Sequence, residues 1–369
     1  MYNSALEILK RLAGPKPLAY EPDLAASYNN LGVLYRTTQR FTDSEQMYNS
    51  ALEIYKRLAA INPQAYDPDL GDSYNNLGIL YHATKRFSDS EQMHKSALKI
   101  YKRLAATNPQ AYEPGLAVCY TNLGLLYSDT QRFAFSEQMH KSAMEIYKRL
   151  AATNPQTYES GLAGSYNNLG LLYHDIQRFT DSELMHKSAL KIRKRLAATN
   201  PQVYEPDLAA SYNNLGILYR ITQRFSDSEQ MHKSALKIYK LLADANPQVY
   251  DSDLGDSYTN LGVLYSDMQR FAACEQMYNS ALEIYKRLMG ENAFIYGQRL
   301  ANCLFWLADS QVNQGEYAEA ISPFEKALKF YKKEAEQEKS IDYYTEIMLW
   351  LHQLYGQEKK YSQAYQCFK

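Results

Sequence analysis

The chain has 369 residues, and its 40 lysines and arginines nearly balance its 41 aspartates and glutamates, giving a formal charge of −1. This balance argues against a nucleic-acid-binding protein or one that binds anionic membranes, because both normally carry a basic excess. The mean hydropathy is −0.51, and no apolar run approaches the roughly 18 residues of a membrane span. Because the N-terminus also lacks a signal-peptide pattern, we expect a cytoplasmic protein without a membrane segment.

A segment that begins at Tyr28 recurs along the chain with a period of 46 residues, and its further copies begin at Tyr74, Tyr120, Tyr166, Tyr212 and Tyr258. A fixed period of this size indicates an array of stacked repeats. We expect one continuous solenoid, divided as a half repeat with only a second helix and linker (1–20), six near-identical repeats (21–296), a divergent seventh repeat (297–342) and a truncated eighth (343–369).

The hydrophobic spacing predicts two helices in each repeat. In the first copy, one helix carries its apolar face from Leu24 to Tyr35, and the acidic–proline–acidic sequence Glu21-Pro22-Asp23 marks its expected start. The other helix is expected to open with the capping box Thr42-Asp43-Ser44-Glu45 and to end at Asn62-Pro63. No stretch alternates with period two over the length of a strand, so we expect an all-α fold.

Two recurring residue types call for a structural reason. A glycine stands inside the first helix of all six copies, although glycine there costs about 1 kcal/mol relative to alanine. We expect it to admit a close approach of the paired helix, with Gly32 opposite Ala51 and likewise in the other copies. The 34 tyrosines include one in each predicted linker, such as Tyr66. We expect its ring to pack under the turn, and a binding role is the alternative.

The shared residues resemble the pattern of the tetratricopeptide repeat family, and those that carry the resemblance are Tyr28, Leu31, Gly32, Tyr35, Phe41, Ser44, Tyr48, Ala51 and Leu52. Ser44 stands where that family usually has alanine, and extra length lies at Lys56 to Asp67. The long unit resembles the repeats of kinesin light chains and of similar prokaryotic arrays. The resemblance implies an all-α, right-handed superhelical solenoid of antiparallel helix pairs that serves as a protein-binding scaffold.

The sequence contains no phosphate-binding loop, His-Glu-x-x-His, Cys-x-x-Cys or Gly-x-Ser-x-Gly motif. A histidine row recurs at the repeat period, with tyrosine in the same position of two further copies: His94, His140, His186, His232, Tyr48 and Tyr278. Packed helices lie about 8–10 Å apart, which is too far for ligands that must each lie about 2 Å from one zinc ion. We therefore expect no metal, no cofactor and no enzymatic activity.

Two further sets have structural interpretations. The cysteines are too few and too scattered for a disulfide framework, and we interpret them as small packing residues: Cys119, Cys274, Cys303 and Cys367. An arginine in each tight turn provides favourable charge at a helix C-terminus. A basic stripe that meets an acidic partner is the alternative for this row, which consists of Arg40, Arg86, Arg132, Arg178, Arg224 and Arg270.

Asparagines supply the candidate binding surface. One is present in all six copies (Asn30, Asn76, Asn122, Asn168, Asn214 and Asn260), and a second precedes it in four (Asn29, Asn75, Asn167 and Asn213). An amide both donates and accepts hydrogen bonds, so this asparagine row suits the backbone of an extended peptide in the concave groove that the resemblance implies. The alternative is that these amides form hydrogen bonds within the scaffold.

A few positions near this row differ between otherwise similar copies, and we expect them to select the side chains of a partner: Arg36, His82, Asp129, His174, Asp175, Arg220 and Asp267. Free drift of exposed positions is the alternative. The expected function is a scaffold that binds a peptide segment or a partner helix. Two alternatives remain, a sensor region of a larger signalling protein whose effector lies outside this chain, and an array that self-associates end to end through Leu6, Ile8 and Leu9.

Overall fold

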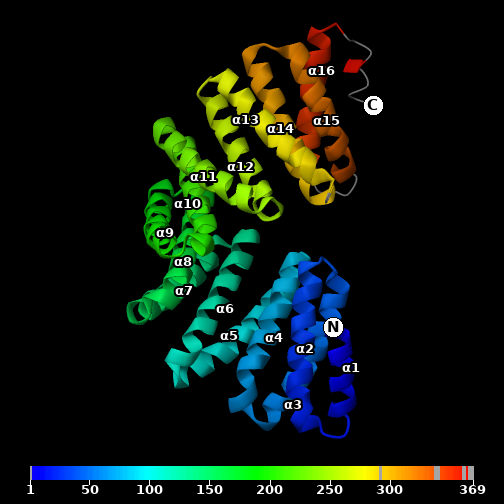
Figure 1. Ribbon diagram of the computed structural model, residues 1–369, viewed down its shortest axis with the longest axis vertical. Coiled ribbons are helices and arrows are strands. Elements are labelled where there is room, and N and C mark those ends of the chain that lie inside the picture. The colour runs from blue at the N-terminus through cyan, green and yellow to red at the C-terminus, as the bar shows by residue number, and fades with distance from the viewer. Residues whose placement is uncertain (1, 291–292, 336–340, 360–362, 365–369) are drawn as a thin grey trace. The chain divides into compact units, whose positions relative to one another are not determined.

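The structure is a computed structural model that describes residues 2–290, 293–335, 341–359 and 363–364. Its internal contacts divide the chain into two units, Met1–Ile192 and Arg193–Lys369, and each is described by itself. The described residues form helices and no strand (Figure 1): α1 (Tyr2–Ala13), α2 (Pro17–Thr37), α3 (Phe41–Ile61), α4 (Pro63–Ala83), α5 (Phe87–Thr107), α6 (Pro109–Asp129), α7 (Phe133–Thr153), α8 (Pro155–Asp175), α9 (Phe179–Thr199), α10 (Pro201–Ile221), α11 (Phe225–Ala245), α12 (Pro247–Asp267), α13 (Phe271–Met289), α14 (Ala293–Gln314), α15 (Tyr317–Ala335) and α16 (Ile341–Gln357).

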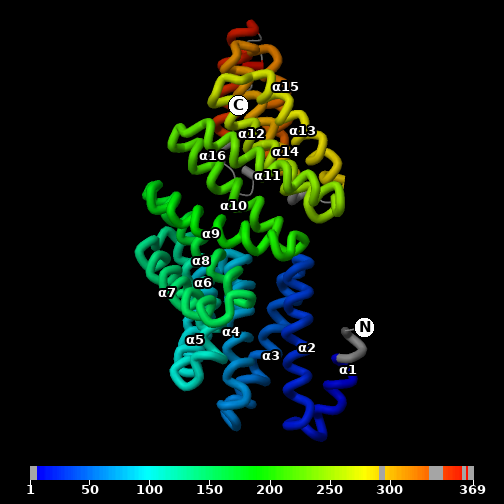
Figure 2. Tube along the Cα trace, turned by 60° about the vertical axis from the view of Figure 1, so that its left-hand side comes forward, coloured from blue at the N-terminus to red at the C-terminus, as the bar shows by residue number. Residues whose placement is uncertain are grey.

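Within each unit, each helix packs against the next one in the chain, as the trace in Figure 2 shows. We number the repeats from the pair α2 and α3, so that α4 and α5 form repeat 2 and α14 and α15 form repeat 7. The two helices of repeat 1 are joined by three residues, Thr38 to Arg40. The backbone N–H of Arg40 donates to the carbonyl of Tyr35 over 2.8 Å and closes the turn. The predicted all-α solenoid of helix pairs is confirmed, and the handedness of its superhelix stays a prediction.

The first helix of each repeat begins earlier than the sequence analysis expected. Helix α4 begins at Pro63, and the Asn62 side chain accepts a hydrogen bond of 3.2 Å from the backbone N–H of Ala65. The expected start at Glu21-Pro22-Asp23 was wrong, since Pro22 lies inside α2. In α4, Pro63 and Pro68 would each fit a first helical turn, but only Pro63 follows an asparagine cap. The expected long linker is therefore a single residue, Asn62.

The predicted capping box was also wrong. Helix α3 begins at Phe41, and its N-cap residue makes no side-chain cap bond. Ser44 is fully buried instead, and its Oγ donates to the backbone carbonyl of Gly32 in the paired helix over 2.8 Å. The same serine–glycine bond recurs at 2.7–2.8 Å in four further repeats, from Ser90, Ser136, Ser182 and Ser228. The serine that stands in place of the family's alanine thus joins the two helices.

Close approach at the glycines is confirmed, but the partner is an aromatic ring and not the expected alanine. A Cβ added to Gly32 would lie 2.5 Å from Cε1 of Tyr48, and one added to Gly78 would lie 2.6 Å from Cε1 of His94. Real Cβ atoms do not approach other atoms so closely, so the flat ring fits only because the helix has no side chain there. The alanine at the expected position, Ala51, is itself fully buried in the core.

The linker tyrosines pack as predicted, but they do so from within the first helix. Tyr66 lies in α4 and is half-buried against the core that α1, α2 and α3 form. Cys119, Cys274 and Cys303 are fully buried, which confirms their interpretation as packing residues. The fourth, Cys367, lies outside the described residues.

A recurring cluster of tyrosine, glutamate and arginine joins neighbouring repeats. The Tyr127 hydroxyl donates to Oε1 of Glu91 in the preceding repeat over 3.0 Å. Arg132 pairs with the same carboxylate at 2.8 Å and covers the Tyr127 ring at 4.3 Å. Equivalent clusters involve Glu45, Glu137 and Glu229. The arginine row is therefore used between repeats, and the simple helix-terminus interpretation accounts for only part of its role.

Candidate functional site

The first position of the asparagine row is largely used inside the scaffold. Asn29 Nδ2 donates to Ser73 Oγ of the next repeat over 2.9 Å, and Asn213 Nδ2 donates to Ser257 Oγ over 3.1 Å. Asn75 is 7% exposed, and its Oδ1 accepts from Asn122 Nδ2 over 2.9 Å. These amides align the first helices of successive repeats, so the scaffold alternative describes them.

The second position of the row is more accessible. Asn30 is exposed, and Asn76, Asn168 and Asn260 are half-exposed. Within the described part of the chain, no hydrogen-bond partner meets these four side chains. Two second-position asparagines differ: Asn122 bonds to Asn75, and Asn214 makes an interaction of its own. Among the first-position asparagines, Asn167 also makes an interaction. The structure thus separates two neighbouring amides that the sequence analysis had treated as one surface.

The sequence analysis missed an aliphatic row on the same helix face. Three positions after each second asparagine stands a valine, leucine or isoleucine, namely Val33, Ile79, Leu125, Leu171, Ile217 and Val263. Residues three apart share a helix face. Val33 and Leu125 are each 38% exposed and Leu171 is 41% exposed. We call this surface of second-position asparagines and aliphatic residues the amide–aliphatic face. Its signal was available, because an aliphatic residue recurred outside the predicted core stripe.

The predicted specificity residues lie at the ends of the first helices, where several of them pair with each other. His82 Nε2 lies 2.7 Å from Asp129 Oδ2, and Arg220 Nη1 donates to Asp267 Oδ2 over 2.8 Å. Both contacts join neighbouring repeats. Part of the variation is therefore matched between repeats.

The three remaining specificity residues, His174, Asp175 and Arg36, are placed differently. His174 Nδ1 lies 3.3 Å from Oδ1 of its neighbour Asp175, on the same helix. Arg36 is half-buried, and its guanidinium lies beside the Tyr48 phenol. Asp175 is exposed at the end of α8. Of the predicted set, the Asp175 carboxylate is accessible, whereas Arg36 is partly enclosed.

The histidine row is buried against the glycines. His94, His140 and His232 are at most 1% exposed, and burial lowers the pKa of each to about 4. Each ring is therefore neutral near pH 7. In the residues that the structure describes, no three histidine, cysteine or acidic side chains converge to hold a metal ion. The row supplies flat packing groups, as Tyr48 and Tyr278 do. His94 and His232 also lie within hydrogen-bond distance of Asn75 and Asn213 through Nδ1.

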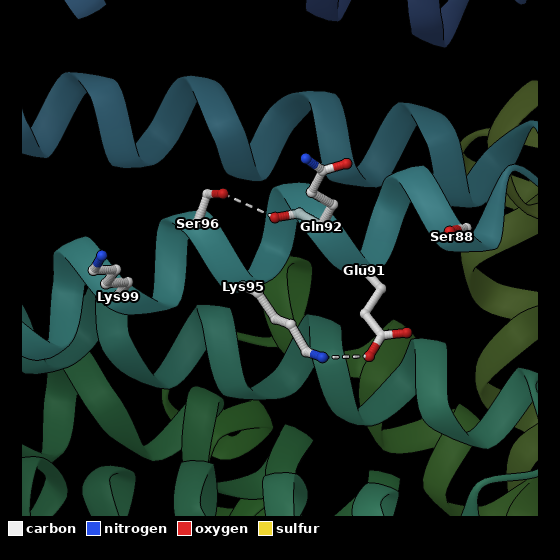
Figure 3. A pocket seen from close by; sticks show the side chains of 6 residues that line it. All are labelled: Ser88, Glu91, Gln92, Lys95, Ser96 and Lys99. Atoms are coloured by element: carbon white, nitrogen blue, oxygen red, sulfur yellow. Dashed lines mark hydrogen bonds and ion pairs between the residues drawn. The ribbon is translucent and has the colours of Figure 1, made fainter.

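A hollow lies beside α5 (Figure 3). It has a volume of about 490 Å³ and is lined by Ser88, Glu91, Gln92, Lys95, Ser96 and Lys99. Glu91 pairs with Lys95 at 2.7 Å and also with Arg132, and Ser96 Oγ donates to the Gln92 carbonyl. Because the Glu91 carboxylate already pairs with Lys95 and Arg132, this hollow is a weaker candidate for a binding site than the amide–aliphatic face.

The chain belongs to the tetratricopeptide repeat family. One family model with that description matches residues 24–62, 70–108 and 116–154, and another matches 161–240 and 253–333. The comparison with curated proteins gave no match. No helix among the described residues is both long enough and apolar enough to cross a bilayer.

Several solved structures share the fold. BtubC (BKLC) from P. vanneervenii is 26% identical, with a TM-score of 0.54 over 65% of this chain and 89% of that one. The apo form of RapI is 15% identical, with a TM-score of 0.59 over 85% and 99%. A Signal Transduction ATPase with Numerous Domains (STAND) protein with a tetratricopeptide repeat sensor, from Pyrococcus horikoshii, is 14% identical, with a TM-score of 0.59 over 100% and 51%.

Proposed function

We propose that this protein is a protein-interaction scaffold whose amide–aliphatic face binds an extended peptide segment or a helix of a partner protein. Tetratricopeptide repeats generally mediate protein–protein interaction, and the family match supports this class of function.

The observation that carries the proposal is the repeated pairing of an accessible amide with an accessible aliphatic side chain. Asn76 and Asn168 offer donors and acceptors to a peptide backbone. Leu125 and Leu171, near them on the first helices, offer apolar surface to peptide side chains. Other recurring polar rows, such as the junction tyrosines and arginines, are bonded within the scaffold.

The predicted specificity residues keep a place in this proposal. Asp175 is accessible beside the amide–aliphatic face. The side chains of the His82–Asp129 and Arg220–Asp267 pairs would separate, or bind a third charged group, when they contact a side chain of the bound peptide. Exposed ion pairs contribute only about 0–1 kcal/mol, so opening them is compatible with recognition.

A recognition region inside a larger signalling protein is the second candidate. The neighbour from Pyrococcus horikoshii carries a tetratricopeptide repeat sensor, and this chain aligns with 51% of its length. The gene sequence on both sides of this reading frame tests the idea, since further coding sequence for an effector is expected if it holds. An isolated reading frame bounded by stop codons would exclude it.

The peptide-binding proposal can be tested with peptides selected from a random dodecamer display library against the immobilised full chain. The dissociation constants of the selected peptides are then measured with the double variant Asn76→Ala/Asn168→Ala. We expect affinity to fall about tenfold, because each lost amide contact contributes about 0.5–1.5 kcal/mol.

The matched control is Gln92→Ala/Gln138→Ala, which removes two exposed amides from the second helices α5 and α7. Its affinity is expected to stay within twofold of wild type, and far-ultraviolet circular dichroism shows whether both variants keep their helix content. Selected peptides that bind the asparagine double variant as tightly as wild type would exclude the amide–aliphatic face as the binding surface.

A further inference from the structure

Three carboxylates gather on the first helices of repeats 1 and 2 without a basic partner. Asp23 comes from α2, and Asp69 and Asp72 come from α4. The Tyr55 hydroxyl donates to the carbonyl of Pro22, the residue before Asp23, over 3.5 Å. Burial and then the charges of Asp69, Asp72 and Asp23 raise the pKa of its phenol. In the described part of the chain, no lysine or arginine pairs with any of the three. We call this set the acidic triad.

A tyrosine hydroxyl of the paired helix α5 fixes one carboxylate of the triad. The Tyr101 hydroxyl donates to Oδ1 of Asp72 over 2.5 Å. Burial raises the pKa of both Asp69 and Asp72. Asp72 is nevertheless exposed. It stands four residues before Asn76 on the same helix face, so the triad is continuous with the amide–aliphatic face.

The same chain contains a second copy of this arrangement, 184 residues later, in the other unit. Asp207, Asp253 and Asp256 lie near Tyr239 and raise the pKa of its phenol after burial has done so. The Tyr285 hydroxyl donates to Oδ1 of Asp256 over 2.6 Å, as Tyr101 does to Asp72. This copy therefore reproduces both the acids and the tyrosine beneath them.

The second copy differs in that two arginines occupy it. Arg299 Nη1 donates to Oδ2 of Asp256 and to the hydroxyl of Ser252. Arg193 lies 3.9 Å from the Asp207 carboxylate and donates to the Asp207 carbonyl over 3.1 Å. Two of the three acids of the second copy, Asp256 and Asp207, thus contact guanidinium groups that the chain itself supplies.

Repeats 1 to 3 lack both arginines. The position of Arg193 is taken by Leu9, and that of Arg299 by Gly115. A Cβ at Gly115 would lie 2.3 Å from Cε1 of Tyr101, so no side chain at this position fits without movement. Pro68 replaces Ser252, which removes one hydroxyl but leaves the carboxylates unchanged. The first copy has the acids of an arginine site without the arginine.

We propose that the acidic triad of Asp23, Asp69 and Asp72 binds an arginine side chain of a partner protein, in the place where Arg299 binds in the second copy. The planar guanidinium fork suits two carboxylates better than the ammonium of lysine does. This inference rests on the proposed function, because it assigns a basic residue to a peptide that lies along the amide–aliphatic face.

Fluorescence anisotropy with three labelled peptides tests the inference on the full chain at low salt. The peptides are acetylated and amidated octamers of alternating Ala-Arg, Ala-Lys and Ala-Gln. Wild type is expected to bind the arginine peptide most tightly. Asp72→Asn should weaken that binding about fivefold or more, which is the scale of one charged contact. Asn can still accept the Tyr101 hydrogen bond, and thermal melts confirm that the variant folds.

Asp256→Asn is the matched control, since Arg299 already occupies the second copy. Its affinity for the arginine peptide is expected to stay within twofold of wild type. The double variant Arg193→Leu/Arg299→Gly gives the second copy the residues of the first at both arginine positions, and it should raise the stoichiometry from one bound peptide to two. Equal losses for Asp72→Asn and Asp256→Asn would overturn the inference, as would displacement of the peptide by equimolar calcium chloride, which would indicate an ion site.

The same experiment separates this inference from the proposed function. If the glutamine peptide binds as tightly as the arginine peptide and needs Asn76 and Asn168, the amide–aliphatic face stands and the triad is excluded. If the arginine peptide needs Asp72 but is unaffected by Asn76→Ala/Asn168→Ala, the triad stands and the proposed face is excluded. Absence of binding by all three peptides would exclude the triad as an arginine site.

Discussion

The imidazole ring of His140 lies directly against the backbone of Gly124 in the paired helix, where an added Cβ would be 2.5 Å from its Cε1 atom. The same contact recurs in the other near-identical repeats, with a histidine or tyrosine ring on each glycine. The two helices of a repeat are thus held at a separation set by the thickness of one ring.

Gly124→Ala is expected to destabilise the protein by about 1–3 kcal/mol, because the new methyl group forces the buried ring or the helix to move. The thermal midpoint measured by circular dichroism reports the change. Gly164→Ala is the matched control, since nothing lies within 4 Å of its added Cβ. That variant should gain up to about 1 kcal/mol from helix propensity. Equal effects of the two substitutions would show that the ring contact is unimportant.

His140→Tyr is expected to flatten the pH dependence of stability. Burial lowers the pKa of His140 to about 4, whereas an unfolded histidine titrates near 6.5. Below about pH 6.5 the unfolded state therefore binds a proton that the folded state excludes, and stability falls until the folded pKa is reached. The contribution is up to about 1.4 kcal/mol per pH unit for one histidine. Tyrosine fills the same position in repeats 1 and 6.

The measurement is the thermal midpoint of wild type and His140→Tyr at intervals from pH 8 to pH 4.5. The variant should lose less stability than wild type across this range, whatever its stability at pH 8. Parallel curves for the two proteins would mean that the His140 ring titrates normally in the folded state.

Glu91→Gln is expected to weaken the junction between repeats 2 and 3 by about 1–3 kcal/mol, the range for hydrogen bonds to a charged group. Although burial opposes the shift, hydrogen bonds from Arg132, Lys95 and Tyr127 lower the Glu91 pKa to about 2. Its contribution is therefore complete above about pH 4.5 and is lost as the pH falls towards 2. The difference in thermal midpoint from wild type should be larger at pH 7 than at pH 3, where only part of the contribution remains.

The matched control for this junction is Glu275→Gln. Repeat 7 has Gln311 and Glu316 at the tyrosine and arginine positions, and Glu275 is exposed. Its replacement should change the free energy of unfolding by less than about 0.5 kcal/mol, as is usual for surface positions, so the thermal midpoint should barely move. A loss as large as that of Glu91→Gln would mean that the junction cluster is not what stabilises the repeats.

Arg193→Tyr is expected to stabilise the second unit by about 1–2 kcal/mol. Arg193 is 8% exposed, and its Nε has no hydrogen-bond partner. Burial lowers its pKa, although Asp207 partly compensates. Replacing a buried, incompletely paired charge by an apolar group of similar size is often stabilising, and tyrosine is the residue of most other repeats. A lower thermal midpoint for the variant would contradict this expectation.

The sequence predicted what depends on period and residue type alone. The 46-residue repeat, the two helices in each copy and the tight approach at Gly32 all follow from spacing and propensity. The partner of a side chain was harder to predict when two partners were within reach along the chain. Thr42 and Glu45 fit a capping box by sequence, yet α3 already begins at Phe41. Ser44, between them, bonds to the carbonyl of Gly32, which only the packed helix pair brings close.

The candidate site shows the same division. Asn29 and Asn30 are adjacent in sequence and differ by about 100° around the helix. Which of them contacts the next repeat depends on the angle at which the repeats stack, and the 46-residue sequence period does not predict that angle. The structure shows that Asn29 bonds to Ser73 while Asn30 stays exposed. The acidic triad was hidden for a similar reason, because its missing arginines are recognised only by comparing distant copies.

The single asparagine at each of the five junctions from repeat 1 to repeat 6 has a consequence for how the gene can change. Deleting residues 63–108 would join Asn62 directly to Pro109 and recreate the same Asn-Pro corner. Tyr127 would then meet Glu45, a carboxylate of the same type as its present partner Glu91. Unequal recombination between copies can therefore shorten or lengthen the array by whole repeats of 46 residues. An insertion of another length within a helix would shift the residues after it out of their contacts with the neighbouring repeat.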